Sequence, residues 1–163
     1  MALLCLRQPL GVLRLTLVLL LALLLPAASG VLGPLEAALS LQMLARPLPG
    51  FWFLLFIGAG ALLPLVIRLL CRRRKAVRLV LTPYLLLLAG QIATEVMVVL
   101  VAGKGLGVMV GLVFTVVRLG QLICLWPLAG NLGWLRGLVA LELGLWGLNA
   151  AQILLNRLLP ILA

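Results

Sequence analysis

The sequence predicts an all-α protein, a polytopic bundle of membrane-spanning helices. Of its 163 residues, 66% are apolar and 10% are charged, whereas an ordinary soluble domain has about 45–50% apolar and about 25% charged residues. The mean hydropathy is +1.35, and the chain contains only three acidic residues. Because so few polar side chains cannot cover a surface in water, lipid must surround most of the chain.

The residue types that the chain lacks exclude several classes of enzyme. It has no histidine and no aspartate, which excludes a Ser-His-Asp triad, a Cys-His pair, a histidine-bound metal and a histidine-ligated haem. A mechanism with paired carboxylates would need two of Glu36, Glu95 and Glu142, which fall in three different segments. We therefore predict a protein that is not an enzyme.

Four apolar stretches are long enough to cross a bilayer, which takes about 20 residues of helix. Aromatic residues mark several of their borders, as expected at a membrane interface. No polar linker separates a second domain, so residues 1–163 are predicted to form one membrane domain. The predicted spans are about 51–70, 79–101, 105–126 and 137–159.

The N-terminal apolar stretch has two interpretations. Arg7 and Arg14 precede an apolar run that ends at Pro26 and small residues, as in a cleavable signal peptide. Against cleavage, the apolar character continues through Val31. We expect a retained first span at about 12–30, which makes five spans in total; cleavage after the small residues would leave four.

The distribution of basic residues predicts the orientation, because Lys and Arg near membrane ends accumulate on the cytoplasmic side. With the N-terminus inside, nine basic residues fall on the inner side and three on the outer side. The inner set is Arg7, Arg14, Arg68, Arg72, Arg73, Arg74, Lys75, Arg78 and Arg136, and the outer set is Arg46, Lys104 and Arg157. We expect a cytoplasmic N-terminus and a C-terminus on the opposite side of a membrane whose identity the sequence does not specify.

The inner side also receives the densest basic cluster and the three cysteines. Topology alone accounts for the cluster as an inside anchor, and its cations are well placed to contact anionic lipid, at about 1 kcal/mol for each; we expect no nucleic-acid partner. These contact residues are Arg72, Arg73, Arg74, Lys75 and Arg78. Cys5, Cys71 and Cys124 then face a reducing compartment and form no disulfide.

A short amphipathic helix is predicted at about 34–46, between the first two spans. Pro34 suits the first turn of a helix and Glu36 is favourable near its N-terminus. Apolar residues recur at helical spacing through this segment, from Leu35 to Met43. We expect this helix to lie on the outer membrane surface, as a connector or as a site for gating or docking.

Small residues follow one face of the span at 105–126. They are Gly103, Gly107, Gly111 and Thr115, each four residues from the next. Small residues at this spacing let two helix backbones approach closely. We expect this face to pack against the preceding span of the same chain, with a partner protein as the alternative.

Gln91, Thr94 and Glu95 place three polar side chains on one face of the span at 79–101. An ionisable residue within a membrane is a functional candidate, because its insertion costs about 2.5–3.5 kcal/mol. Proton or cation handling is one interpretation. An interhelical hydrogen bond from a neutral Glu95 is the other, and it is slightly favoured because this half of the membrane holds one acid.

Arg118 is predicted to form an intramembrane ion pair with Glu142. At about 1.5 Å per helical residue, both lie about 8–12 Å from the inner end of their spans, whereas Glu95 lies nearer the outer face. An unpaired arginine at such depth would be costly. Glu142 is therefore the better-matched partner.

The last span carries a polar seam. Glu142, Asn149 and Asn156 are seven residues apart, and Gln152 lies between the latter two, which keeps them on one side of the helix. The seam is interpreted as a contact between helices or as the lining of a hydrated or cofactor pocket. No cofactor is indicated, although Gln91, Asn149 or Gln152 has the oxygen ligand that a magnesium tetrapyrrole accepts.

Two function classes remain. The favoured one is a structural or assembly subunit that packs with other membrane subunits, or with copies of itself, in a larger complex. The absence of a soluble domain and of a catalytic residue set favours it. The alternative is a small transporter or channel in which Glu95, Arg118 and Glu142 form a proton or ion path.

Overall fold

The structure, a computed structural model, describes residues 6–45, 50–130 and 132–162. These residues are almost all helical, and they include five helices that are long and apolar enough to cross a membrane. The prediction of an all-α bundle with five apolar helices is thereby confirmed. Of the residues used to predict orientation and redox environment, Arg46 and Cys5 lie outside the described ranges.

Two of the five apolar helices contain π-helical turns. The first is α2 (Pro9–Ala28), and the second is a continuous rod made of α4 (Gly50–Leu55), η1 (Phe56–Leu62) and α5 (Leu63–Leu70). The third is α6 (Lys75–Ala102), and the fourth is α7 (Lys104–Leu125) with the 3-10 turn η2 (Trp126–Ala129). The fifth is made of α8 (Gly133–Ile153), η3 (Leu154–Leu158) and α9 (Leu159–Leu162). The turns η1 and η3 are π-helical. Such turns are rare and frequently lie at functional sites.

The helices extend beyond the apolar segments that predicted them. The predicted span at 79–101 begins at Lys75, and the one at 137–159 begins at Gly133, because hydrogen bonding continues into polar residues that hydropathy does not count. The first helix begins earlier than predicted, at Pro9, whose fixed φ suits a first turn. It ends at Ala28, before Gly30, which has a positive φ of 74°.

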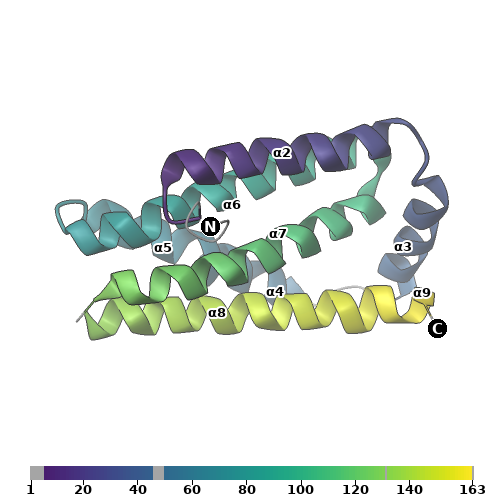
Figure 1. Cartoon of the computed structure of the whole chain (residues 1–163). Coiled ribbons are helices and arrows are strands. Elements are labelled where there is room, and N and C mark those ends of the chain that lie inside the picture. Colours follow the sequence, from purple (N-terminus) through teal and green to yellow (C-terminus); the bar gives the residue numbers. More distant parts are fainter. Residues whose placement is uncertain (1–5, 46–49, 131, 163) are drawn as a thin grey trace.

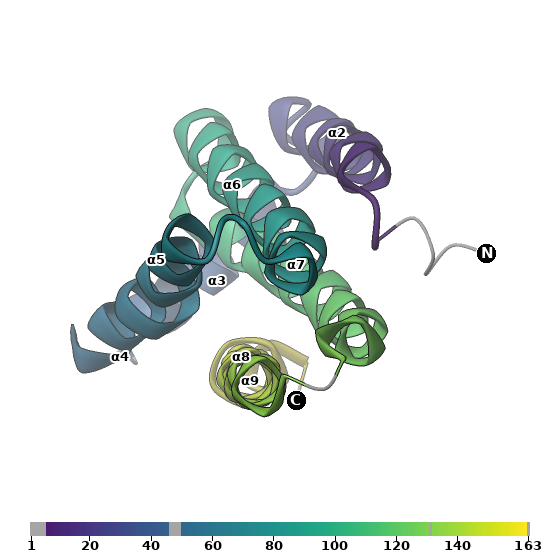
Figure 2. The same cartoon turned by 90° about the vertical axis from the view of Figure 1, so that its left-hand side faces the viewer.

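Helices α6 and α7 form the centre of the bundle and run antiparallel (Figures 1 and 2). Gly103 joins them with a φ of 103°, a conformation that glycine adopts without strain. Helices α2 and α5 pack against α6, and α8 packs against α7. The loop between α5 and α6 and the loop before α8 lie at one end of the bundle, whereas the turn at Gly103 lies at the other (Figure 1).

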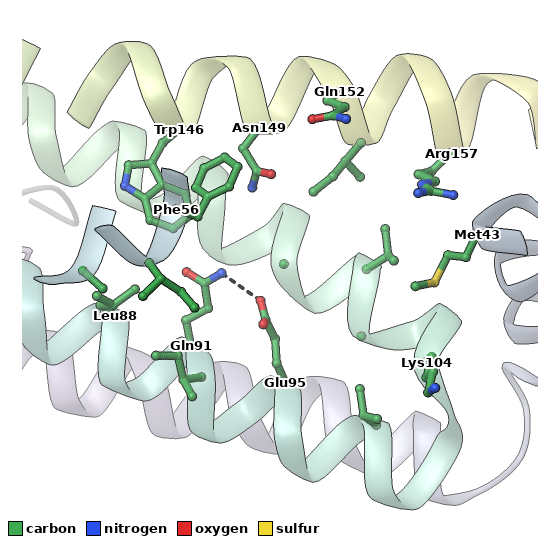
Figure 3. Close-up of a pocket in the computed structure, with 18 residues that line it drawn as sticks. Met43, Phe56, Leu88, Gln91, Glu95, Lys104, Trp146, Asn149, Gln152 and Arg157 are labelled. Atoms are coloured by element: carbon green, nitrogen blue, oxygen red, sulfur yellow. Dashed lines mark hydrogen bonds between the residues drawn. The ribbon is translucent and has the colours of Figure 1, made fainter. Parts of the chain in front are cut away.

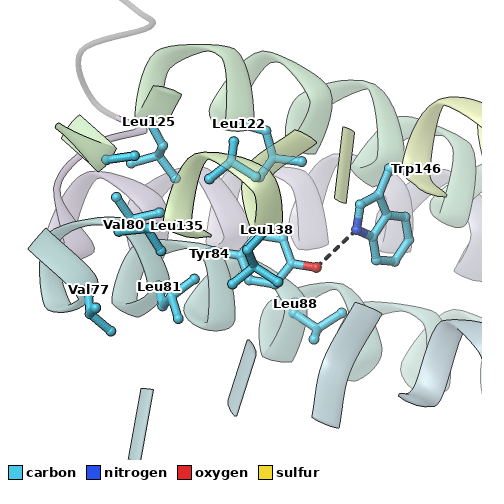
Figure 4. Packing of buried hydrophobic residues seen from close by; sticks show 12 residues of the cluster. Val77, Val80, Leu81, Tyr84, Leu88, Leu122, Leu125, Leu135, Leu138 and Trp146 are labelled. Carbon is cyan, nitrogen blue, oxygen red and sulfur yellow. Dashed lines mark hydrogen bonds between the residues drawn. The ribbon is translucent and has the colours of Figure 1, made fainter. Parts of the chain in front are cut away.

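A hydrophobic cluster fills the end of the bundle near the α5–α6 loop. It joins the first half of α6 to the last half of α7 and the first half of α8, through residues such as Val77, Leu81, Leu125 and Leu135 (Figure 4). A second cluster, which includes Phe114, joins α2, α3, α6 and α7. Leucine and valine also dominate the outward faces of the helices, as expected for contact with lipid.

Helix α3 (Gly33–Ala45) crosses the end of the bundle near Gly103 (Figure 1). Its Leu39 is buried, while Leu41 and Leu44 are exposed. Glu36 accepts a hydrogen bond from the backbone N–H of Leu106, at 2.7 Å. A carboxylate at the N-terminus of α7 satisfies an otherwise unpaired N–H group and interacts favourably with the helix dipole, so α3 is fixed to the bundle by Glu36 together with the buried Leu39.

Candidate functional site

Arg118 is the largest fully buried side chain of the described residues, with 0% of its surface exposed. Its Nη2 atom donates a hydrogen bond to Oε1 of Gln91 at 2.7 Å. The guanidinium carbon lies 5.0 Å from the ring centroid of Tyr84 and 4.3 Å from that of Trp146. Both are cation–π distances, so two ring faces hold the positive charge, while its Nε and Nη1 atoms have no hydrogen-bond partner among the described residues.

Glu142 binds the polar edges of the same two aromatic side chains. Its Oε2 atom accepts a hydrogen bond from the indole N–H of Trp146 at 3.1 Å and lies 2.6 Å from the hydroxyl of Tyr84. That hydroxyl is also 2.7 Å from the carbonyl oxygen of Gly60 in η1. Since a phenol has one proton, Tyr84 donates to either Glu142 or Gly60 at any moment.

The predicted direct ion pair between Arg118 and Glu142 is not formed among the described residues. Tyr84 and Trp146 link the two charges instead, with ring faces toward the cation and with O–H and N–H groups toward the anion. The electron-rich face of an aromatic ring attracts a cation, and its polar substituents donate to an anion. The similar depths of Arg118 and Glu142 in their spans predicted that the two residues lie in the same region. Depth does not predict that aromatic rings lie between them.

A second carboxylate extends the polar cluster toward the opposite end of the bundle. The amide Nε2 of Gln91 donates to Oε1 of Glu95 at 2.8 Å, so polar contacts run from Arg118 through Gln91 to Glu95. Thr94, which was predicted on the same face, is buried but donates to the carbonyl of Gly90 in its own helix. It is therefore not part of the cluster.

Of the small residues predicted on one face, Gly107 and Gly111 face α6 of the same chain, whereas Thr115 accepts a hydrogen bond from Asn149 of α8. A Cβ atom added at Gly107 would lie 2.7 Å from Val99, and one added at Gly111 would lie 3.2 Å from Oε1 of Glu95. Gly103 was predicted on the helix face with the other small residues, but it lies in the turn before α7. A Cβ atom added there would overlap Glu36.

The residues of the polar seam in the last span lie in different environments. Glu142 belongs to the aromatic cluster, whereas Asn149 donates to the hydroxyl of Thr115 at 3.1 Å and thereby joins α8 to α7. Gln152 lines a cavity, and Asn156 lies in η3 outside that lining. The contacts therefore combine both interpretations of the seam, helix contact and pocket lining.

A cavity of about 550 Å³ lies beside this cluster, between η1, α6, α7 and α8 (Figure 3). Gln91, Glu95, Asn149 and Gln152 form its polar part, and Lys104 and Arg157 line the end near α3. The other lining residues are Met43, Phe56, Ile57, Ala61, Leu88, Ile92, Val99, Gly107, Val108, Gly111, Trp146 and Ile153. Two predicted polar faces, on α6 and α8, thus meet at one cavity.

Gln91, Asn149 and Gln152 are not arranged as a ligand set for a metal or a tetrapyrrole. The Gln91 oxygen already accepts a hydrogen bond from Arg118, and the described residues include no cluster of metal-binding side chains. None of the basic residues Arg72, Arg73, Arg74, Lys75 and Arg78 lines the cavity, and all five are exposed at the α5–α6 loop and the start of α6.

Tyr84, Trp146 and Gly60 are site residues that sequence reasoning missed. Tyr84 is the only tyrosine of the chain and lies inside an apolar helix, away from the interfacial positions that tyrosine favours. Trp146 follows Glu142 by four residues, a spacing that places both on one helix face. These two signals were available, whereas nothing in the sequence indicated that the Gly60 carbonyl faces Tyr84.

Comparisons with models of protein families, with curated proteins and with solved structures find no match to this chain.

Proposed function

We propose that this protein is a non-enzymatic integral membrane protein that acts as a structural or assembly subunit of a larger membrane complex. The observation that supports this most is the use of intramembrane polar side chains as links between helices. Arg118, Gln91, Glu142 and Tyr84 join α6, α7 and α8, and Asn149 joins α8 to α7. Such bonds give a small bundle a defined shape on which other subunits assemble.

Purification under mild conditions tests the subunit proposal. The protein is extracted from its native membrane in a mild detergent, separated on a native gel, and its co-migrating proteins are identified by mass spectrometry. A subunit co-purifies with other membrane proteins, or with copies of itself, in a constant ratio that survives a second purification step. Migration as a lone chain at every detergent concentration contradicts the proposal.

A small transporter or channel is the second candidate, and one observation favours it. The cavity reaches Glu95, and polar contacts continue from Glu95 through Gln91 and Arg118 to Tyr84 and Glu142. A series of such groups is suited to a proton or ion path. Reconstitution of the purified chain alone in liposomes, with a pH-sensitive or ion-sensitive dye inside, tests this function without any partner.

The proposed orientation has the N-terminus and the α5–α6 loop on the cytoplasmic side. The described basic residues support it: Arg72, Arg73 and Arg74 are exposed in that loop, and Arg7 donates a hydrogen bond to the carbonyl of Cys124, near the end of α7. The first span is proposed to be retained, and intact-mass measurement tests this. Loss of about the first 29 residues would favour the signal peptide.

Helix α3 is proposed to lie at the outer membrane surface. Its Leu41 and Leu44 are exposed apolar side chains suited to contact with lipid, and Leu39 faces the bundle. Its position across the end of the bundle (Figure 1) fits a helix parallel to the membrane plane. Depth-dependent quenching of a fluorophore attached at position 44 by lipid-bound quenchers tests this placement.

A further inference from the structure

The cavity beside α6 and α8 has the size and the two-sided lining of a small-molecule site. Its volume of about 550 Å³ lies within the range of about 300–1,000 Å³ that is usual for such sites. One wall is apolar and aromatic, with Phe56, Ile57 and Ala61 from the rod that contains η1 (Figure 3). Glu95 on α6 and Gln152 on α8 add polar groups from facing sides (Figure 3), so an occupant must be apolar over most of its surface and polar where it meets them.

Glu95 presents an unused hydrogen-bond acceptor to this cavity. Its Oε1 atom accepts from Gln91, while its Oε2 atom has no hydrogen bond from any described residue. The side-chain amide of Gln152 is likewise without a hydrogen bond from or to the described part of the chain. A carboxylate among apolar side chains is unfavourable without a further donor, and a donor carried by a ligand meets this need.

Aromatic rings line the same cavity as the Glu95 carboxylate, a combination that is typical of sites for organic cations. Phe56 and Trp146 both line the cavity, with ring centroids 5.4 Å apart. Trp146 already binds the guanidinium of Arg118 on a ring face, which shows that this side chain is placed for cation–π contact. A carboxylate together with aromatic faces binds an alkylammonium group more strongly than either feature does alone.

The positions of the charged residues favour one part of the cavity for a cationic group. Glu95 lines the cavity from α6, whereas Glu142 and Arg118 do not belong to its lining. Lys104 and Arg157 line the end of the cavity near α3. Their positive charges oppose a second amine there, which favours a ligand with one amine placed at Glu95.

We propose that the cavity binds an apolar organic molecule with a single basic amine, which pairs with Glu95 while its hydrocarbon part contacts the η1 wall. The proposal goes beyond the subunit function and does not depend on it. The competing class is an anionic amphiphile held by Lys104, and the experiment separates the two.

The test measures binding of three matched probes to the full chain in lipid nanodiscs. The probes are radiolabelled 4-phenylbutylamine, 4-phenylbutanol and 4-phenylbutyrate, which share a hydrocarbon part and differ in charge. Equilibrium dialysis at pH 7 gives the bound amount after subtraction of uptake by empty nanodiscs. We expect saturable binding of one amine for each chain, with an affinity at least tenfold higher than that of the alcohol. This comparison needs no variant and therefore does not depend on the folding of one.

Variants then locate the bound amine. Glu95→Gln keeps the acceptor for Gln91 but removes the charge, and it should weaken amine binding at least tenfold while leaving alcohol binding unchanged. Phe56→Leu should weaken it severalfold by removing an aromatic face. Val96→Ala is the matched control, because Val96 lies on the same helix, is exposed and does not line the cavity; its binding should equal that of the unmodified chain.

Three results would overturn the proposal. The first is equal affinity for the amine and the alcohol in the unmodified chain, and the second is unchanged amine binding in Glu95→Gln. The third is preferred binding of the carboxylate probe that is lost in Lys104→Gln, which would establish the anionic class instead. Complex assembly does not enter this measurement, so its outcome is independent of the native-gel experiment.

Discussion

The hydroxyl of Tyr84 lies 2.6 Å from Oε2 of Glu142, although the two residues are 58 positions apart in the sequence. This contact joins α6 to α8, and the carbonyl of Gly60 brings η1 to the same hydroxyl. Three segments of the chain therefore meet at one oxygen atom. Because buried polar groups are costly without partners, this oxygen is a sensitive position in the fold.

Replacement of Tyr84 by Phe tests the importance of that hydroxyl. The carbonyl of Gly60 and the carboxylate of Glu142 lose a shared donor, and a buried group left without its hydrogen bond costs about 1–3 kcal/mol. We expect a lower unfolding temperature in detergent. Leu100→Ala, at an exposed position of the same helix, should change it much less. Equal effects of the two variants would show that the hydroxyl adds no stability.

Arg118 and Glu142 are expected to be energetically coupled through the rings between them. Arg118→Leu and Glu142→Leu should each lower the unfolding temperature, because each leaves the other buried charge without its counterpart. The double variant should recover part of the loss, with a coupling of about 0.5–3 kcal/mol, as is usual for residues in one network. Additive losses in the double-mutant cycle would mean that Tyr84 and Trp146 isolate the charges rather than link them.

Gly107 and Gly111 are expected to reject large side chains. Leu at either position would overlap Val99 or Glu95 of α6 and should separate α6 from α7, reducing the yield of folded protein in size-exclusion chromatography. Val116→Leu is the control, because Val116 is 58% exposed on the same helix. If all three variants fold equally well, the close contact between the helices is not required.

Glu36 is expected to stabilise the start of α7 from outside that helix. Glu36→Ala removes the acceptor for Leu106 N–H and the favourable charge at the helix N-terminus, with a cost of about 1 kcal/mol, comparable to loss of a helix cap. Glu36→Gln keeps an acceptor and should cost less. Hydrogen exchange of residues 104–107 measures the effect locally, and Leu41→Ala on the exposed face of α3 should leave that exchange unchanged.

The orientation is tested by labelling single cysteines in intact cells. Cys5, Cys71 and Cys124 are first replaced by Ser, and a cysteine is then introduced at Lys75 or Lys104. An impermeant thiol reagent applied outside should label position 104 and leave position 75 unlabelled until the cells are permeabilised. Labelling of position 75 from outside would reverse the proposed orientation.

The sequence was enough to identify the charged and amide residues of the candidate site. It was not enough to predict which residues they contact. Gln91, Glu95, Arg118 and Glu142 are conspicuous because polar side chains are rare in apolar spans. Their partners depend on the rotation of each helix about its axis, and a small change in rotation exchanges one neighbour for another. Depth alone therefore suggested a direct ion pair where the structure has two aromatic side chains.

The sequence by itself determined the class of fold: five long apolar helices are the way in which a chain with so few polar groups satisfies its backbone hydrogen bonds in lipid. The tertiary structure decided how the polar exceptions are used. It turned Glu36 of α3 onto the start of α7, placed Tyr84 and Trp146 between two charges, and brought the polar faces of α6 and α8 to one cavity. Hydropathy is a property of each segment alone, whereas these contacts depend on how separate segments rotate and pack against one another.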